Sequence, residues 1–188
     1  DWLIRYPHGC IEQVTSAVFP QLYLENLIEL SQEQQTQIQE NIQSAITTLM
    51  EFQLPEGGFA YWPGNTTVSH WGTNYAGHFL LEAQSRGYDL PEGMMERWIS
   101  YQRKAARNWS ADNYYDTYRN TGLTQAYRLY VLALAGEPEK GAMNRLRKST
   151  DINLQARWRL AAAYHLTGKV QVARGMVNEL ATEVDEYQ

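Results

Sequence analysis

A cysteine and a glutamine three positions apart are the residues of this sequence whose types and spacing suggest chemistry. Cys10 is the only cysteine among 188 residues, and one helical turn brings the side-chain amide of Gln13 back beside its sulfur. The sulfur can attack the amide carbon, so that ammonia leaves and an internal thioester remains. Such a bond is an acyl electrophile held inside the protein until a nucleophile reaches it. This chemistry requires no metal and no cofactor, and we predict neither.

The residues around this pair favour a turn that leads into a helix. Pro7 disfavours helical backbone in the residue before it, and Gly9 tolerates backbone angles that other residues avoid. Glu12 would then lie in the first helical turn, where the helix dipole favours a carboxylate. A lone cysteine is more often a buried small hydrophobe, and only its neighbours make the thioester interpretation the stronger one.

Residues 6–13, Tyr-Pro-His-Gly-Cys-Ile-Glu-Gln, closely resemble the thioester motif of the bacterial alpha-2-macroglobulin family. Ile11 stands where the related animal proteins have Gly, a departure typical of the bacterial branch. Residues 57–64, Gly-Gly-Phe-Ala-Tyr-Trp-Pro-Gly, and residues 71–76, Trp-Gly-Thr-Asn-Tyr-Ala, also resemble the thioester domain of that family. The resemblance covers nearly the whole chain, and it is least specific in the last third.

The resemblance implies a covalent protease trap rather than a turnover enzyme. Cys10 and Gln13 would form the thioester, with Gly9 and Glu12 in supporting roles. Cleavage of a bait segment elsewhere would expose the bond, and an amine of the attacking protease would be acylated. The implied partners are target proteases and other domains of the same parent chain. The implied location is the periplasm, or an outward-facing membrane anchor, of a bacterium.

Composition excludes several other classes of function. The formal charge of −5 and the absence of a basic stripe argue against a nucleic-acid partner. The longest apolar run, residues 129–135, is far too short to span a bilayer, so we predict no transmembrane segment here. One cysteine permits no internal disulfide, so cysteine usage does not identify the compartment.

Apolar residues recur at helical spacing, and no stretch alternates convincingly like a strand. We expect about eight helices, with the first bent at Pro20, another begun by a Ser31/Gln34 capping box and another with Pro91 in its first turn. The expected ranges are 10–28, 31–52, 69–86, from 91 onward, 121–135, 139–148, 153–167 and 169–186, with a Tyr- and Asn-rich connection over 109–120.

Three of these helices end in a glycine and turn directly into another, which indicates antiparallel helix hairpins. We predict a single helical domain over residues 1–188. The resemblance implies that the hairpins form an α/α toroid. It also implies that this chain is the N-terminal portion of a longer thioester domain, with the final hairpins missing.

Three aromatic residues lie in or just after a Gly/Pro-rich segment, where helix packing does not explain them: Tyr61, Trp62 and Trp71. We predict that they shield the thioester from water or plug the toroid. His8 is the histidine nearest to Cys10, whereas structural roles are expected for His70, His78 and His165.

Two alternative functions remain open. One is an α/α-toroid enzyme acting on polysaccharides, with Tyr, His and Asn side chains between residues 62 and 78 as its acids and bases. The other is a helical scaffold with no covalent chemistry. Neither alternative explains why Cys10 and Gln13 stand at this spacing, and under both of them Cys10→Ala should change nothing.

Overall fold

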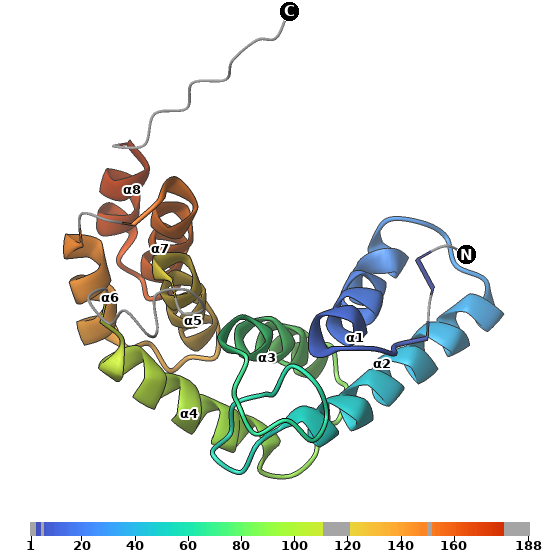
Figure 1. The fold of residues 1–188 in the computed structure, drawn as a ribbon. Helices are drawn as coiled ribbons and strands as arrows, with labels where there is room; N and C mark the ends of the chain where they lie inside the picture. The colour runs from blue at the N-terminus through green and yellow to red at the C-terminus, as the bar shows by residue number, and fades with distance from the viewer. Residues whose placement is uncertain (1–2, 5, 111–120, 150–151, 179–188) are drawn as a thin grey trace, which may run out of the picture. The chain divides into compact units, whose positions relative to one another are not determined.

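The computed structural model describes residues 3–4, 6–110, 121–149 and 152–178. These residues form eight α-helices and one 3-10 helix (Figure 1), so the predicted all-helical class is confirmed. The elements in chain order are α1 (Ile11–Val18), η1 (Pro20–Asn26), α2 (Gln32–Phe52), α3 (His70–Ser85), α4 (Met94–Asn108), α5 (Gly122–Leu134), α6 (Lys140–Lys148), α7 (Leu154–Leu166) and α8 (Val170–Asn178).

The chain divides into two compact units, Asp1–Lys104 and Ala105–Gln188, and the boundary falls within α4. The organisation of residues 1–188 as one domain stays a prediction. Most of the connection predicted over 109–120 and the end of the last predicted helix, from residue 179, lie outside the described residues. Among the described residues, no helix combines the length and apolarity needed to cross a bilayer.

In the first unit, α1 packs against both α2 and α3. The capping box that begins α2 is present as predicted: the Gln34 backbone N–H donates to Ser31 Oγ, and the Ser31 N–H donates to Gln34 Oε1. The predicted apolar stripe of this helix is confirmed, since every member is buried. It consists of Ile38, Ile42, Ala45, Ile46, Leu49 and Phe52.

Two helix boundaries predicted at prolines are wrong. The first helix does not bend at Pro20 and continue; α1 ends at Val18, and a 3-10 helix begins at Pro20, which has no N–H for the α-helical ladder. Pro91 is not in the first turn of α4, which begins three residues later at Met94. Gly93 lies between them with φ of +72°, a backbone angle outside the right-handed helix.

The loop of residues 53–69, here called the α2–α3 loop, is fixed by main-chain hydrogen bonds although it contains no regular strand. Isolated antiparallel bridges join Gln53 to Phe59 and Ala60 to Val68. The buried hydroxyl of Thr73, on α3, accepts a hydrogen bond from the Phe59 N–H (2.9 Å) and donates to the Phe59 carbonyl (3.3 Å). One side chain of α3 therefore satisfies the main chain at the middle of this loop.

We expect Thr73→Val to lower the free energy of unfolding by about 1–3 kcal/mol, because it leaves the buried Phe59 N–H without its acceptor. Thr73→Ser is the matched control, since it keeps the hydroxyl and loses only a methyl group. Urea unfolding of the two variants measures the difference. Equal stability of the valine and serine variants would show that the loop does not depend on this hydroxyl.

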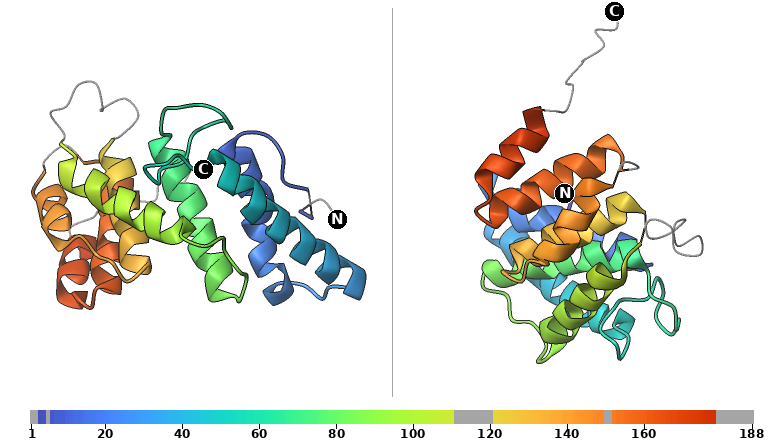
Figure 2. Two further views of the ribbon diagram at one scale, coloured as in Figure 1. Left: turned by 90° about the horizontal axis from the view of Figure 1, so that it is seen from below. Right: turned by 90° about the vertical axis from the view of Figure 1, so that its left-hand side faces the viewer.

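In the second unit, α7 packs against α5 on one side and pairs with α8 on the other (Figures 1 and 2). The turn between α7 and α8 contains Gly168 with φ of +76°, as expected for a glycine that ends a helix. The Arg107 guanidinium donates two hydrogen bonds to the Glu139 carboxylate, at 3.0 and 2.7 Å. This bidentate pair raises the pKa of Arg107 and joins the end of α4 to the residue before α6.

Candidate functional site

Cys10 lies at the N-cap of α1 and is buried, with 4% of the residue exposed. The backbone N–H of Cys10 donates to Gln13 Oε1 at 3.0 Å, and the backbone N–H of Gln13 in turn faces the Cys10 side chain. This is the reciprocal geometry of a capping box, with a thiol and a carboxamide in the usual places of a hydroxyl and a carboxylate. The helix start therefore holds the two predicted reactive side chains together.

Gly9 provides the space for the Gln13 carboxamide. Its φ is +108°, and a Cβ built on it would overlap Gln13 Oε1 and crowd the amide carbon. Any other residue at this position would meet both a strained backbone angle and a steric clash with the predicted electrophile. The structure thus gives a physical reason for the glycine directly before Cys10.

The hydrogen bond from the Cys10 N–H has a chemical consequence for the amide. If the sulfur attacks the amide carbon, negative charge develops on Gln13 Oε1, the atom to which this N–H already donates. A backbone donor aimed at a developing oxyanion lowers the barrier to acyl transfer. The arrangement is therefore suited both to forming and to opening an acyl bond at this carbon.

Tyr61, on the α2–α3 loop, contacts this helix start through its main chain. Its carbonyl accepts a hydrogen bond from the Ile11 N–H at 3.1 Å, which satisfies a free amide of the first turn of α1. The nearby Cys10 side chain, through hydrogen bonding and charge, and the charge of Glu12 raise the pKa of Tyr61 to about 12. Tyr61 itself is 39% exposed.

We expect Cys10→Ala to lower the pKa of Tyr61 from about 12 toward the ordinary value of 10, because the hydrogen bond and the charge at Cys10 are the largest causes of the shift. The folded protein holds the Tyr61 proton more tightly than the unfolded chain does. This difference stabilises the fold fully below about pH 10, and the stabilisation is lost as the pH rises from 10 to 12. NMR titration of ring-labelled tyrosine in protein with a free Cys10 thiol measures the value, and Tyr61→Phe identifies the resonance. An unchanged pKa in Cys10→Ala would mean that the sulfur does not contact the hydroxyl.

The remaining predicted site residues are Glu12, Trp62 and Trp71. Glu12 is half-buried in the first turn of α1, and its charge contributes to the raised pKa of Tyr61. Trp62 packs edge-on against the Tyr61 ring, with centroids 6.0 Å apart. Trp71 lies in the first turn of α3 and is exposed. The shielding role of the three aromatic residues stays a prediction.

Gln13 also lines a cavity of about 400 Å³ that opens beside α1. Tyr6 forms part of its wall and is fixed by a hydrogen bond from Ser44 on α2 to its hydroxyl (3.0 Å). His8 is another wall residue, and its Nδ1 lies 3.1 Å from the Tyr6 carbonyl. The full lining is Leu3, Tyr6, His8, Gln13, Ser16, Ala17 and Pro20. A nucleophile can therefore approach the Gln13 amide from this side.

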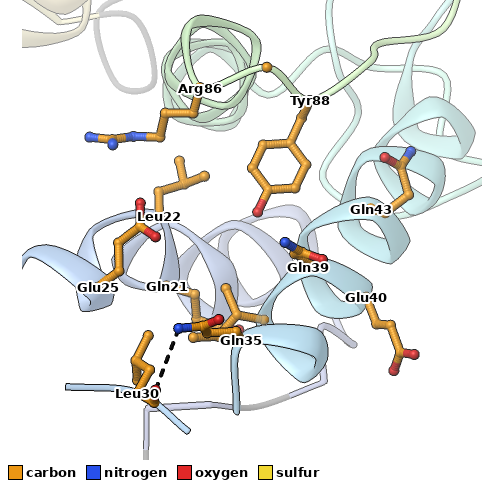
Figure 3. A pocket seen from close by; sticks show the side chains of 12 residues that line it. Gln21, Leu22, Glu25, Leu30, Gln35, Gln39, Glu40, Gln43, Arg86 and Tyr88 are labelled. Carbon is orange, nitrogen blue, oxygen red and sulfur yellow. Dashed lines mark hydrogen bonds between the residues drawn. The ribbon is translucent and has the colours of Figure 1, made fainter. Parts of the chain in front are cut away.

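A larger cavity of about 570 Å³ lies between η1, α2 and the end of α3 (Figure 3). Gln35, Gln39 and Gln43 of α2 line it, together with Arg86 and Tyr88. None of the predicted reactive or shielding residues belongs to its lining, so this cavity has no part in the chemistry proposed for Cys10.

Two histidines of the polysaccharide alternative have neighbours that are consistent with structural roles. His70 Nδ1 lies 3.4 Å from the Tyr101 hydroxyl. The ring of His78 packs edge-on against Phe19, and its Nε2 lies 3.9 Å from Glu82. Among the described residues, no three His, Cys, Asp or Glu side chains gather as metal ligands.

The sequence interpretation missed Thr73 and the main-chain contact between Tyr61 and Ile11. A threonine within a helix carries no pattern that identifies a loop anchor. A contact between residues 50 positions apart has no local signal either.

Comparison with known proteins relates the chain to one family. Residues 1–109 match the family model described as the A-macroglobulin TED domain. Alpha-2-macroglobulin of Escherichia coli K12 is 31% identical over 99 residues, which are 50% of this chain and 6% of that protein. The chain thus spans only a small part of this curated relative.

Two solved structures are similar to the fold. The crystal structure of trypsin-activated alpha-2-macroglobulin from Escherichia coli has a TM-score of 0.77 at 24% identity, over 92% of this chain and 13% of that one. The crystal structure of Salmonella alpha-2-macroglobulin reacted with methylamine has a TM-score of 0.75 at 26% identity, over 94% of this chain and 12% of that one. The helical fold described above is therefore that of a segment of a much longer protein in both cases.

Proposed function

This chain belongs to the alpha-2-macroglobulin family through its thioester domain, and from that premise we propose that Cys10 and Gln13 form an internal thioester that captures proteases covalently. The observation that carries the proposal is the reciprocal contact of Cys10 and Gln13 at the start of α1, with Gly9 leaving room for the amide. The buried sulfur and the cavity beside Gln13 support it further.

The proposed chemistry has two acyl-transfer steps. In the first, the Cys10 sulfur attacks the Gln13 amide carbon, a C–S bond forms, and the C–N bond breaks with release of ammonia. In the second, a primary amine attacks the same carbon, an amide forms, and the C–S bond breaks. The proton lost by the amine ends on the sulfur, so a free Cys10 thiol is regenerated. Each molecule reacts once, which makes the protein an inhibitor by capture and not a catalyst.

The known relatives support this choice of nucleophile and target. The Salmonella relative was crystallised after reaction with methylamine, a small primary amine, and the Escherichia coli relative after activation by trypsin. For this chain we propose amines of an attacking protease as the acceptors. Cleavage of a bait segment in another domain of the parent chain would start the reaction. We further propose a periplasmic or outward-facing, membrane-anchored location in a bacterium.

Intact mass of the full-length protein, with a count of thiols under native conditions, tests the proposal first. We expect the mass to be short by one ammonia and the Cys10 thiol to be unreactive. Methylamine should then add one adduct at Gln13 and release one thiol at Cys10. Cys10→Ala and Gln13→Ala are the controls, and each should have the full expected mass and take up no methylamine.

The same measurements separate this proposal from its alternatives. A full mass, a free thiol from the start and no methylamine adduct would contradict the thioester. A scaffold or a polysaccharide enzyme would also tolerate Cys10→Ala without loss of function, whereas a covalent trap would lose all capture of a test protease such as trypsin.

A further inference from the structure

The part of the chain that contains α5, α6, α7 and α8 is strongly basic. Residues 121–149 and 152–178 include nine Lys and Arg residues against two Asp and Glu residues, a net charge of +7, whereas the whole chain has a formal charge of −5. One of the two carboxylates, that of Glu139, is already paired with Arg107. These helices therefore present an excess of positive charge that nearly all of their own residues leave uncompensated.

A cavity of about 490 Å³ beside α6, α7 and α8 is lined by three of these cations. Arg147 and Lys148 belong to the last turn of α6, and Arg157 is the fourth residue of α7. None of the three forms an ion pair with another residue that the structure describes. Because charges of one sign around a concave site concentrate ions of the opposite sign, this cavity favours an anion.

Helix-end electrostatics explain only part of this arrangement. A helix C-terminus favours cations, so Arg147 and Lys148 are stabilised at the end of α6 without any ligand. Arg147 is also positioned by Tyr164, since its guanidinium lies 5.8 Å from the ring centroid and the Tyr164 hydroxyl donates to Asn144 Oδ1 at 2.7 Å. The dipole does not explain Arg157, because it lies near the start of α7, where an anion is favoured.

Part of the cavity wall is apolar, which distinguishes this site from one for a small inorganic ion. Ile152, just before α7, is buried, and Val172 and Met176 of α8 are partly buried against the same core. The volume lies in the range of sites for organic ligands. Since an Arg guanidinium binds a carboxylate through two parallel hydrogen bonds, a matching ligand combines carboxylates with aliphatic groups.

We propose that this cavity binds an acidic peptide segment, with carboxylates at the three cations and an aliphatic side chain against the apolar wall. The inference does not depend on the thioester. Either this chain or a partner protein can supply such a segment. Residues 179–188 lie outside the described residues, and their sequence, Glu-Leu-Ala-Thr-Glu-Val-Asp-Glu-Tyr-Gln, has four carboxylates, Leu and Val, and no Lys or Arg. This composition makes them a suitable probe.

The experiment measures the binding of a fluorescent, acetylated and amidated peptide of residues 179–188 to the full-length protein by fluorescence anisotropy. A control peptide has Gln and Asn in place of the four acidic residues. We expect only the acidic peptide to bind, and more weakly as the salt concentration rises. Arg157→Gln and, at an exposed position, Lys148→Gln should each weaken binding about tenfold, the effect of losing one hydrogen bond to a charged group. Arg174→Gln is the matched control, since this exposed arginine of α8 does not line the cavity.

A second full-length protein distinguishes the two sources of the segment, and the cavity substitutions are made in it as well. It carries Glu179→Gln, Glu183→Gln, Asp185→Asn and Glu186→Gln. If the acidic peptide binds this protein but not the wild type, the site takes the acidic residues of its own chain. If it binds both equally, the site takes a segment of a partner. Absence of binding to both proteins, equal binding of the control peptide, or an equal effect of Arg174→Gln would each overturn the proposal.

Discussion

Gly9→Ala is expected to slow the formation of the methylamine-reactive thioester about 10²-fold, the size of rate loss that a displacement of about 1 Å causes between reacting groups. The new Cβ would overlap Gln13 Oε1 and crowd the amide carbon. The carboxamide would have to swing away, and the hydrogen bond from the Cys10 N–H would break. Intact mass with and without methylamine measures the remaining thioester.

The control for this variant must share its backbone strain but not its clash. Gly87, after the end of α3, has φ of +88°, and a Cβ there would meet no atom within 4 Å. Gly87→Ala should therefore destabilise the fold by a similar strain term and keep the thioester intact. If both variants lose methylamine reactivity equally, general destabilisation explains the loss, and the space beside Gly9 has no specific role.

The core of the site could be predicted from the sequence because it is local. Cys10 and Gln13 are three residues apart, and helical geometry alone brings such positions together. Gly9 could be assigned to the turn before the helix for the same reason, since the structure places it there with a positive φ. The sequence did not reveal that the glycine also makes room for the amide, because that contact depends on the side-chain rotamer of Gln13.

The contact of the α2–α3 loop with the start of α1 could be predicted only in outline. The sequence predicts Tyr61 as a shielding ring near the thioester, but the hydrogen bond of its carbonyl with the Ile11 N–H depends on how the α2–α3 loop is anchored. That anchoring comes from Thr73 and from main-chain bridges between residues far apart in the sequence. Such contacts follow from tertiary packing, which spacing and residue type do not determine.

The sequence predicted the presence of the helices more accurately than the residues at which they begin and end. Apolar periodicity identified α2 from its buried stripe, and the Ser31 cap located its start. The prolines predicted the helix ends less well, since a proline is compatible with a helix bend, with the first turn of a helix or with a helix end. A 3-10 helix begins at Pro20, and α4 begins three residues after Pro91.

Trp98→Ala is expected to cost about 3–5 kcal/mol of the free energy of unfolding, because it empties the largest fully buried side chain of the described residues. The indole N–H donates to the Thr73 carbonyl at 2.8 Å, on the same residue that anchors the α2–α3 loop through its hydroxyl. Loss of this side chain should therefore also loosen the loop that carries Tyr61. Urea unfolding gives the stability, and the rate of spontaneous hydrolysis of the thioester reports on the loop.

A second substitution shows whether close packing is the cause. The Trp98 ring lies so close to Gly77 on α3 that a Cβ there would overlap the indole. Gly77→Ala alone should cost about 1–3 kcal/mol through overpacking. In the Trp98→Ala background the clash is gone, and the same change should stabilise the helix by about 0.5–1 kcal/mol. This reversal of sign is a coupling that a double-mutant cycle measures directly. If Gly77→Ala has the same effect in both backgrounds, Trp98 does not pack on this glycine, and its contribution to the site must come from the hydrogen bond to Thr73 alone.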